Sequence, residues 1–195
     1  MNYPLQMRFK IMALAPQIHV TDSTGATVCY VRQKMFRLKE NVSVFRDESQ
    51  KTLLCEIKAD RIIDWSASYH FYDTTGATFG GVRRKGMRSI WKAYYELMDE
   101  SNQQFANISE ENPLAKIGDA LLSEIPVLGI LTGYFFHPKY LLKSAAGQPL
   151  MRMTKHRAFL EGRFEIEKLG EGDEVDELRA LMSFLMMALL ERQRG

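Results

Sequence analysis

Short runs in which hydrophobic and polar residues alternate recur along most of the chain. The segments Ile18–Lys34 (IHVTDSTGATVCYVRQK) and Tyr69–Lys85 (YHFYDTTGATFGGVRRK) are identical at nine of seventeen aligned positions, at an offset of 51 residues. Related segments occupy Val42–Lys58 and Tyr94–Glu110. Alternation with a period of two, in runs rich in Val, Ile, Tyr, Phe and Thr, is typical of half-buried strands. The pattern therefore predicts a β-hairpin that is repeated along the chain.

Each predicted hairpin has a turn signal at its centre. An aspartate opens the turn in four units, at intervals of 25, 26 and 26 residues: Asp22, Asp47, Asp73 and Asp99. A carboxylate there accepts hydrogen bonds from the turn backbone, and the residue three positions later adopts a positive φ. Glycine or asparagine suits that position, which holds Gly25, Gly76 and Asn102, and Gly147 in a fifth unit that Ser144 opens. The pattern does not explain Gln50, which ends the second turn.

The number of hairpins gives an estimate of the sheet. Five hairpins contribute ten strands, and similar alternation in MRFKIMAL near the start and RFEIEKL near residue 165 raises the estimate to about twelve. Many short, evenly spaced strands with few helical signals indicate a sandwich or a closed barrel.

The C-terminal segment decides between these architectures. Four acids at residues 173–177 precede an apolar run and two arginines follow it, which predicts a helix at about residues 174–193. Between Leu178 and Leu190 the only uncharged polar residue is Ser183, so every face of this helix requires burial. A barrel of about twelve strands can surround a helix about 10 to 12 Å across. We therefore predict a mainly β fold, a closed antiparallel barrel around a central hydrophobic C-terminal helix.

A single domain accounts for residues 1–195, since all-β barrels of this length commonly form one domain. Residues 112–138 break the hairpin rhythm, and PLAKIGDALLSEI within them has helical spacing. We interpret residues 112–138 as an insertion into the barrel.

This layout resembles the Tubby C-terminal-like superfamily. A barrel of about twelve strands threaded by a hydrophobic C-terminal helix is the architecture of that superfamily, and the D-x-x-G hairpins with basic strand ends are similar to its LURP-one-related and phospholipid-scramblase-like branch. The resemblance covers nearly the whole chain through layout and turn pattern. It implies the fold, and family members are associated with phosphoinositide binding, membrane-proximal roles and transcriptional regulation. No family ligand residue matches this sequence one by one.

The composition is that of an ordinary globular protein, with 46% hydrophobic and 26% charged residues. A formal net charge of +2 is small for a nucleic-acid-binding domain. The N-terminus lacks the apolar core of a secretory signal, and the apolar stretches Ile125–Phe136 and Leu178–Leu190 are too short to span a bilayer. We expect no transmembrane segment and a cytoplasmic protein, either free or peripheral to a membrane.

Histidine and cysteine show no pattern of a metal or catalytic site. No H-x-x-H or H-E-x-x-H arrangement includes any of the four histidines, His19, His70, His137 and His156. His19 and His70 hold equivalent places in the repeat, which favours a position on a strand surface. Cys29 and Cys55 form no C-x-x-C pair and are expected to be small buried residues. We expect no metal site.

Catalytic motifs are also missing from the sequence. It contains no G-x-S-x-G elbow, P-loop or G-x-G-x-x-G motif. Gly80 and Gly81 fall within a strand pattern, where a bulge or close packing explains them better than phosphate binding. We therefore predict no catalytic residues and no cofactor.

Cationic residues are predicted to gather on the outside of the barrel. The central helix fills the interior, so binding must use the outer wall or the loops. Strand alternation places Val31 and Val82 on one face and the neighbouring basic residues on the other. The candidate ligand-binding face comprises Arg32, Lys34, Arg37, Arg83, Arg84, Lys85, Arg88 and Lys92, with Trp91 as a candidate membrane contact. Such a surface suits an anionic membrane, although solvated cations are common on any protein.

These observations favour a non-enzymatic cytoplasmic binding module that engages anionic, phosphoinositide-type headgroups or a protein partner through its basic face. The alternative is a nucleic-acid-binding or regulatory protein that uses the same face together with residues 139–157. A third hypothesis is an enzyme whose active residues come together only in the fold.

Overall fold

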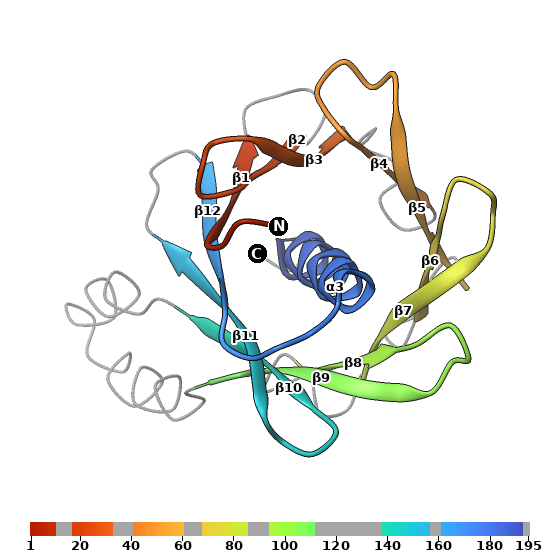
Figure 1. Cartoon of the computed structure of the whole chain (residues 1–195), viewed down its shortest axis with the longest axis vertical. Helices are drawn as coiled ribbons and strands as arrows, with labels where there is room; N and C mark the ends of the chain where they lie inside the picture. The colour runs from red at the N-terminus through yellow and green to blue at the C-terminus, as the bar shows by residue number, and fades with distance from the viewer. Residues whose placement is uncertain are drawn as a thin grey trace, which may run out of the picture.

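Twelve antiparallel strands form a closed barrel around one helix in the computed structural model, which describes residues 1–10, 17–32, 41–60, 68–85, 94–111, 138–156 and 161–192. The elements are β1 (Leu5–Lys10), β2 (Gln17–Thr21), β3 (Thr27–Arg32), β4 (Asn41–Phe45), β5 (Leu53–Ala59), β6 (Ser68–Tyr72), β7 (Thr78–Arg84), β8 (Tyr94–Met98), β9 (Gln104–Glu110), β10 (Lys139–Ser144), β11 (Pro149–His156), β12 (Glu161–Lys168) and α3 (Glu174–Arg192). Each strand pairs with its neighbours in sequence, and β1 pairs with β12 to close the ring (Figure 1). The predicted barrel is confirmed.

The helix α3 runs through the middle of this ring (Figure 1). No residue from Ala180 to Leu189 is more than 5% exposed, which meets the requirement of a helix that is apolar on every face. The strand residues that point inward are also buried, as Ile18 and Val20 of β2 illustrate. The helix and the inner faces of the strands therefore share one hydrophobic core.

The first turn of α3 carries the signals that start the helix. The carboxylate of Asp173 accepts a hydrogen bond of 2.8 Å from the backbone N–H of Asp176, which satisfies one of the free donors at the helix N-terminus. Glu177 is 7% exposed and its Oε1 lies 2.6 Å from Nζ of Lys168 in β12. The acids at the start of α3 thus cap the helix and attach it to the wall.

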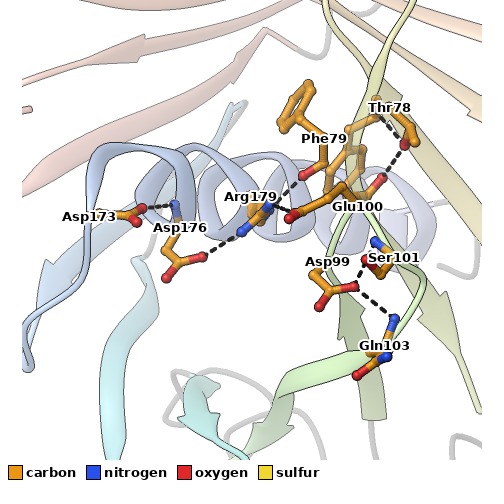
Figure 2. A network of polar contacts seen from close by, with 11 residues as sticks. Thr78, Phe79, Asp99, Glu100, Ser101, Gln103, Asp173, Asp176 and Arg179 are labelled. Carbon is orange, nitrogen blue, oxygen red and sulfur yellow. Dashed lines mark hydrogen bonds and ion pairs between the residues drawn. The ribbon is translucent and has the colours of Figure 1, made fainter.

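Arg179 fastens α3 to the opposite wall of the barrel (Figure 2). Its Nε donates to the backbone carbonyl of Phe79 at 2.6 Å, and its other nitrogens pair with Asp176 and Glu100. Gly80 makes this approach possible, because a Cβ there would lie 3.2 Å from the Arg179 side chain and 2.7 Å from the carbonyl oxygen of Met98. Close packing therefore explains this glycine, as the sequence predicts.

All five predicted turns have the expected geometry. Each opening residue accepts a backbone hydrogen bond from the residue three positions later, as between Asp22 and Gly25 at 2.9 Å. The closing residues have φ values of 84°, 57°, 89°, 59° and 81°, at Gly25, Gln50, Gly76, Asn102 and Gly147. Gln50, which the sequence pattern leaves unexplained, thus occupies the same left-handed position as the glycines.

The predicted insertion at residues 112–138 lies outside the described residues except for Pro138. The helix predicted at about residues 174–193 is described over 174–192.

We expect Phe184→Ala to lower the free energy of unfolding by about 3 to 5 kcal/mol, because Phe184 is fully buried in α3 and truncation leaves a cavity. Urea unfolding followed by circular dichroism measures this change. Val175→Ala is the control, since Val175 is 46% exposed on the same helix. Equal effects of the two substitutions would contradict the central burial of α3.

We expect Gln50→Gly to raise the free energy of unfolding by about 0.5 kcal/mol. Glycine removes the steric cost of the left-handed backbone, and this gain exceeds the entropic cost of a more flexible unfolded chain. Gly76→Ala is the opposite case. It should lower the free energy of unfolding by about 1 kcal/mol, although nothing lies within 4 Å of the added Cβ. Thermal melts of both variants test the pair, and a loss of stability in Gln50→Gly would refute the explanation.

Candidate functional site

The repeated basic residues of the sequence lie on separate parts of the outer wall. Val31 and Val82 are buried inside, and Arg32 and Arg83 point outward at the ends of β3 and β7, in agreement with strand alternation. Three strands separate β3 from β7 in the ring. Neighbouring strands are about 4.8 Å apart, so the two arginines are roughly 19 Å apart along the wall. Equivalent places in the repeat do not bring their charges together.

Arg83 and Lys85 form a compact ion cluster with Glu96 of β8. Nε and Nη2 of Arg83 donate to one carboxylate oxygen at 3.2 and 2.8 Å, and Nζ of Lys85 lies 2.8 Å from the other. Burial by itself raises the pKa of Glu96, but the hydrogen bonds and charges of Lys85 and Arg83 outweigh it and lower the pKa. These two cations are therefore partly neutralised by a carboxylate of the protein itself.

Arg84 corrects the prediction of the outer basic face. It is 8% exposed and lies two residues from Val82, on the inner face of β7. Its register partner is Tyr95, and the guanidinium carbon lies 5.9 Å from the centre of that ring. Strand alternation is the physical reason, since consecutive residues of a strand point to opposite faces. Arg84 is thus an interior residue.

Five of the predicted site residues lie outside the described part of the chain: Lys34, Arg37, Arg88, Lys92 and the candidate membrane contact Trp91. Arg32 is therefore the one member of the predicted face that the structure describes as exposed and that forms no hydrogen bond or ion pair with another described residue.

Closure of the barrel brings other cations to the side of Arg32. The register pairs Arg32 with Gln17 of β2, and Gln17 with Lys10 of β1. We call the outer surface where the two ends of the chain meet the seam surface, and its basic residues are Arg8, Lys10, His19, Arg32, His156 and Arg163. Alternation in MRFKIMAL signals that Arg8 and Lys10 share a face. Closure of the barrel implies that β1 pairs with β12, but the register of this pairing leaves no signal in the sequence, so this group was missed.

The cysteines and histidines occupy the positions that the sequence suggests. Cys29 and Cys55 are free and buried, and Cys55 Sγ lies 3.4 Å from Sδ of Met182. Burial raises the pKa of the Cys55 thiol to about 12 and that of Cys29 further, so both thiols are protonated at neutral pH. His19 and His70 are half-buried residues on the outer faces of β2 and β6.

Neither a metal-binding cluster nor a membrane-spanning helix occurs among the described residues. They contain no cluster of three or more His, Cys, Asp or Glu side chains suited to a metal ion. Within the same residues, no helix combines the length and the apolar character needed to cross a membrane.

The fold and surface define a class of proteins in which an antiparallel barrel encloses its own C-terminal helix. Residues 27–121 match the family model of LURP-one-related proteins, which confirms the family resemblance seen in the hairpin pattern. A crystal structure of a protein from Arabidopsis thaliana is similar to this chain at a TM-score of 0.53 and 12% identity, over 98% of this chain and 92% of that one. At this identity the likeness shows the fold alone. No curated protein matches the sequence.

We expect Glu96→Gln to lower the free energy of unfolding by about 1 kcal/mol at neutral pH, through weaker bonds to Arg83 and Lys85. Because the pKa of Glu96 is lowered in the folded state, its contribution is complete above the unfolded pKa of about 4.3 and disappears as the pH falls through the folded value. Urea unfolding of both proteins across acidic pH measures the difference. Glu56→Gln is the control, since Glu56 forms an ion pair with one cation, the exposed Lys58. If the stability difference between the wild type and Glu96→Gln grew on acidification, the stabilising role assigned to the Glu96 carboxylate would be wrong.

Proposed function

We propose that the protein is a non-enzymatic cytoplasmic binding module that engages anionic, phosphoinositide-type membrane surfaces through the outer wall of its barrel. The observation that carries the proposal is the position of α3. Barrels that hold small molecules place them in the lumen, but here the stretch from Ala180 to Leu189 occupies it. A ligand therefore has the outer wall and the loops available to it.

The charge distribution supports an anionic ligand. Arg8, Lys10 and Arg32 are exposed and form no hydrogen bond or ion pair with any other residue that the structure describes. Each cation near an anionic membrane contributes about 1 kcal/mol, so three on the same part of the wall give a weak, salt-sensitive attraction. Lys34, Arg37, Arg88, Lys92 and Trp91 stay predicted members of the binding face.

The wall that bears Arg32 is a better candidate than the wall that bears Arg83. Arg83 and Lys85 already share the carboxylate of Glu96, and a headgroup would have to compete with it. Arg32 has no such competitor among the described residues. The family match covers both Arg32 and Arg83 and does not distinguish them.

Co-sedimentation with phosphatidylcholine vesicles, with and without a phosphoinositide, tests the proposal. The wild-type protein should bind the phosphoinositide vesicles at low salt and dissociate as salt is raised. We expect Arg32→Gln to weaken binding about fivefold, the equivalent of about 1 kcal/mol. Arg83→Gln is the matched loss of one arginine and should weaken binding less than twofold.

Two results would overturn the proposal or its surface. No binding of the wild type at low salt would exclude the membrane function and favour a protein partner. A larger effect of Arg83→Gln than of Arg32→Gln would contradict the choice of wall. Gel-shift titration with nucleic acid over the same salt range tests the alternative, and binding to nucleic acid without binding to vesicles would replace the proposal.

A further inference from the structure

A row of four basic side chains crosses the outer wall where the chain closes the barrel. His156 of β11 is the register partner of Arg163 of β12, Arg163 is the partner of Arg8 of β1, and Arg8 is the partner of His19 of β2. Direct partners project from the same face of a sheet with Cβ atoms about 4.5 to 5.5 Å apart. Their outward direction follows from Met7 and Phe9, which flank Arg8 and are buried in the core. In Figure 1, β12 and β1 lie side by side at this position.

This row differs from two register pairs elsewhere on the described wall. Arg83 is the register partner of Glu96 and Arg152 is the partner of Glu167, and each pair forms an ion pair. At the seam surface Arg8 faces Arg163 instead. Like charges directly opposite each other destabilise a sheet. An anion bound between the two guanidiniums would interact favourably with both.

The neighbouring positions enlarge the positive surface on one side. Lys10 lies two residues beyond Arg8, about 7 Å along the strand, and Gln17 connects it to Arg32. Arg8, Lys10, Arg32, His156 and Arg163 are all exposed to solvent.

Carboxylates set the limits of the surface. Glu165 accepts a hydrogen bond of 2.7 Å from the Gln6 amide, and Glu48 lies 3.0 Å from Nδ1 of His19. Glu161 holds the register position opposite Lys10. The centre of the positive surface is therefore the pair of Arg8 and Arg163, with His156 at one side.

We propose that the seam surface is a binding site for a phosphate-type dianion, such as a phosphate monoester or a pyrophosphate, centred on Arg8 and Arg163. A guanidinium presents a planar fork of donors that matches two oxygens of a phosphate. Two guanidiniums on directly opposite residues can donate to different oxygens of one tetrahedral anion, and the imidazole of His156 adds a further donor. This goes beyond the membrane function, because a soluble phosphate can occupy the site without any lipid.

Histidine NMR of the whole chain with inorganic pyrophosphate at low salt is a direct test. The imidazole signals of His156 and His19 should shift in a saturable manner. His70 is an internal control, since it holds the equivalent place in the repeat but has Lys58 and Gly81 as register partners. Its signal should stay in place, which also reports that the fold is intact.

Two matched substitutions distinguish a specific phosphate-binding site from a general attraction of pyrophosphate to the cations of the surface. Arg8→Gln should weaken pyrophosphate binding about tenfold, because it removes a charged donor from the centre of the site. Lys58→Gln removes one charge from the outer face of β5, beside His70 and away from the seam surface, and should change binding less than twofold. No saturable shift of His156, parallel shifts of His70, or equal effects of the two substitutions would overturn the proposal.

A second experiment, with phosphoinositide vesicles, decides whether the phosphate belongs to a lipid headgroup or to a soluble molecule. Loss of vesicle binding in Arg8→Gln would assign the site to a lipid headgroup. If the wild type binds pyrophosphate but no vesicles, the membrane function fails while the site stands, and the ligand is a soluble phosphate. If it binds vesicles without any shift of His156, the site fails and the membrane function stands.

Discussion

The burial of α3 is the constraint on which the rest of the structure depends. A helix that is apolar on all sides cannot lie on a surface, because part of it would stay in contact with water. Twelve strands close around it and supply an apolar inner face, and no residue from Ala180 to Leu189 is more than 5% exposed. Arg179 and Glu177 attach the polar first turns of the helix to the wall at Phe79 and Lys168. Helix and barrel thus form a single core.

A filled lumen moves recognition to the outside, where the chemistry is electrostatic. Some charges of the described wall are paired across strands, as Arg83 with Glu96 and Arg152 with Glu167 show. The seam surface is different, because Arg8 stands opposite Arg163. A sheet gains from opposite charges at partner positions and loses from like charges. This local conflict sets the seam surface apart from the other strands.

Repetition in the sequence predicts local geometry better than it predicts a binding surface. The five turns behave alike because each depends on a few neighbouring residues, including the left-handed position that Gln50 shares with the glycines. Side-chain surroundings do not repeat. His19 lies between Arg8 and Tyr30, whereas His70 lies between Lys58 and Gly81. A strand's neighbours come from the whole ring, so equivalent residues meet different partners.

The sequence by itself determined the hairpins, the turns, the approximate strand number and the position of the central helix, because alternation, turn residues and an apolar run act over short distances. The tertiary structure alone decided which charges meet. It placed Arg84, which alternation along β7 already turns inward, beside Tyr95, partly neutralised Arg83 with Glu96, and set the register of β1 and β12 so that Arg8 faces Arg163. The physical reason is that strand register and barrel closure depend on packing against α3, which residue spacing along the chain does not encode.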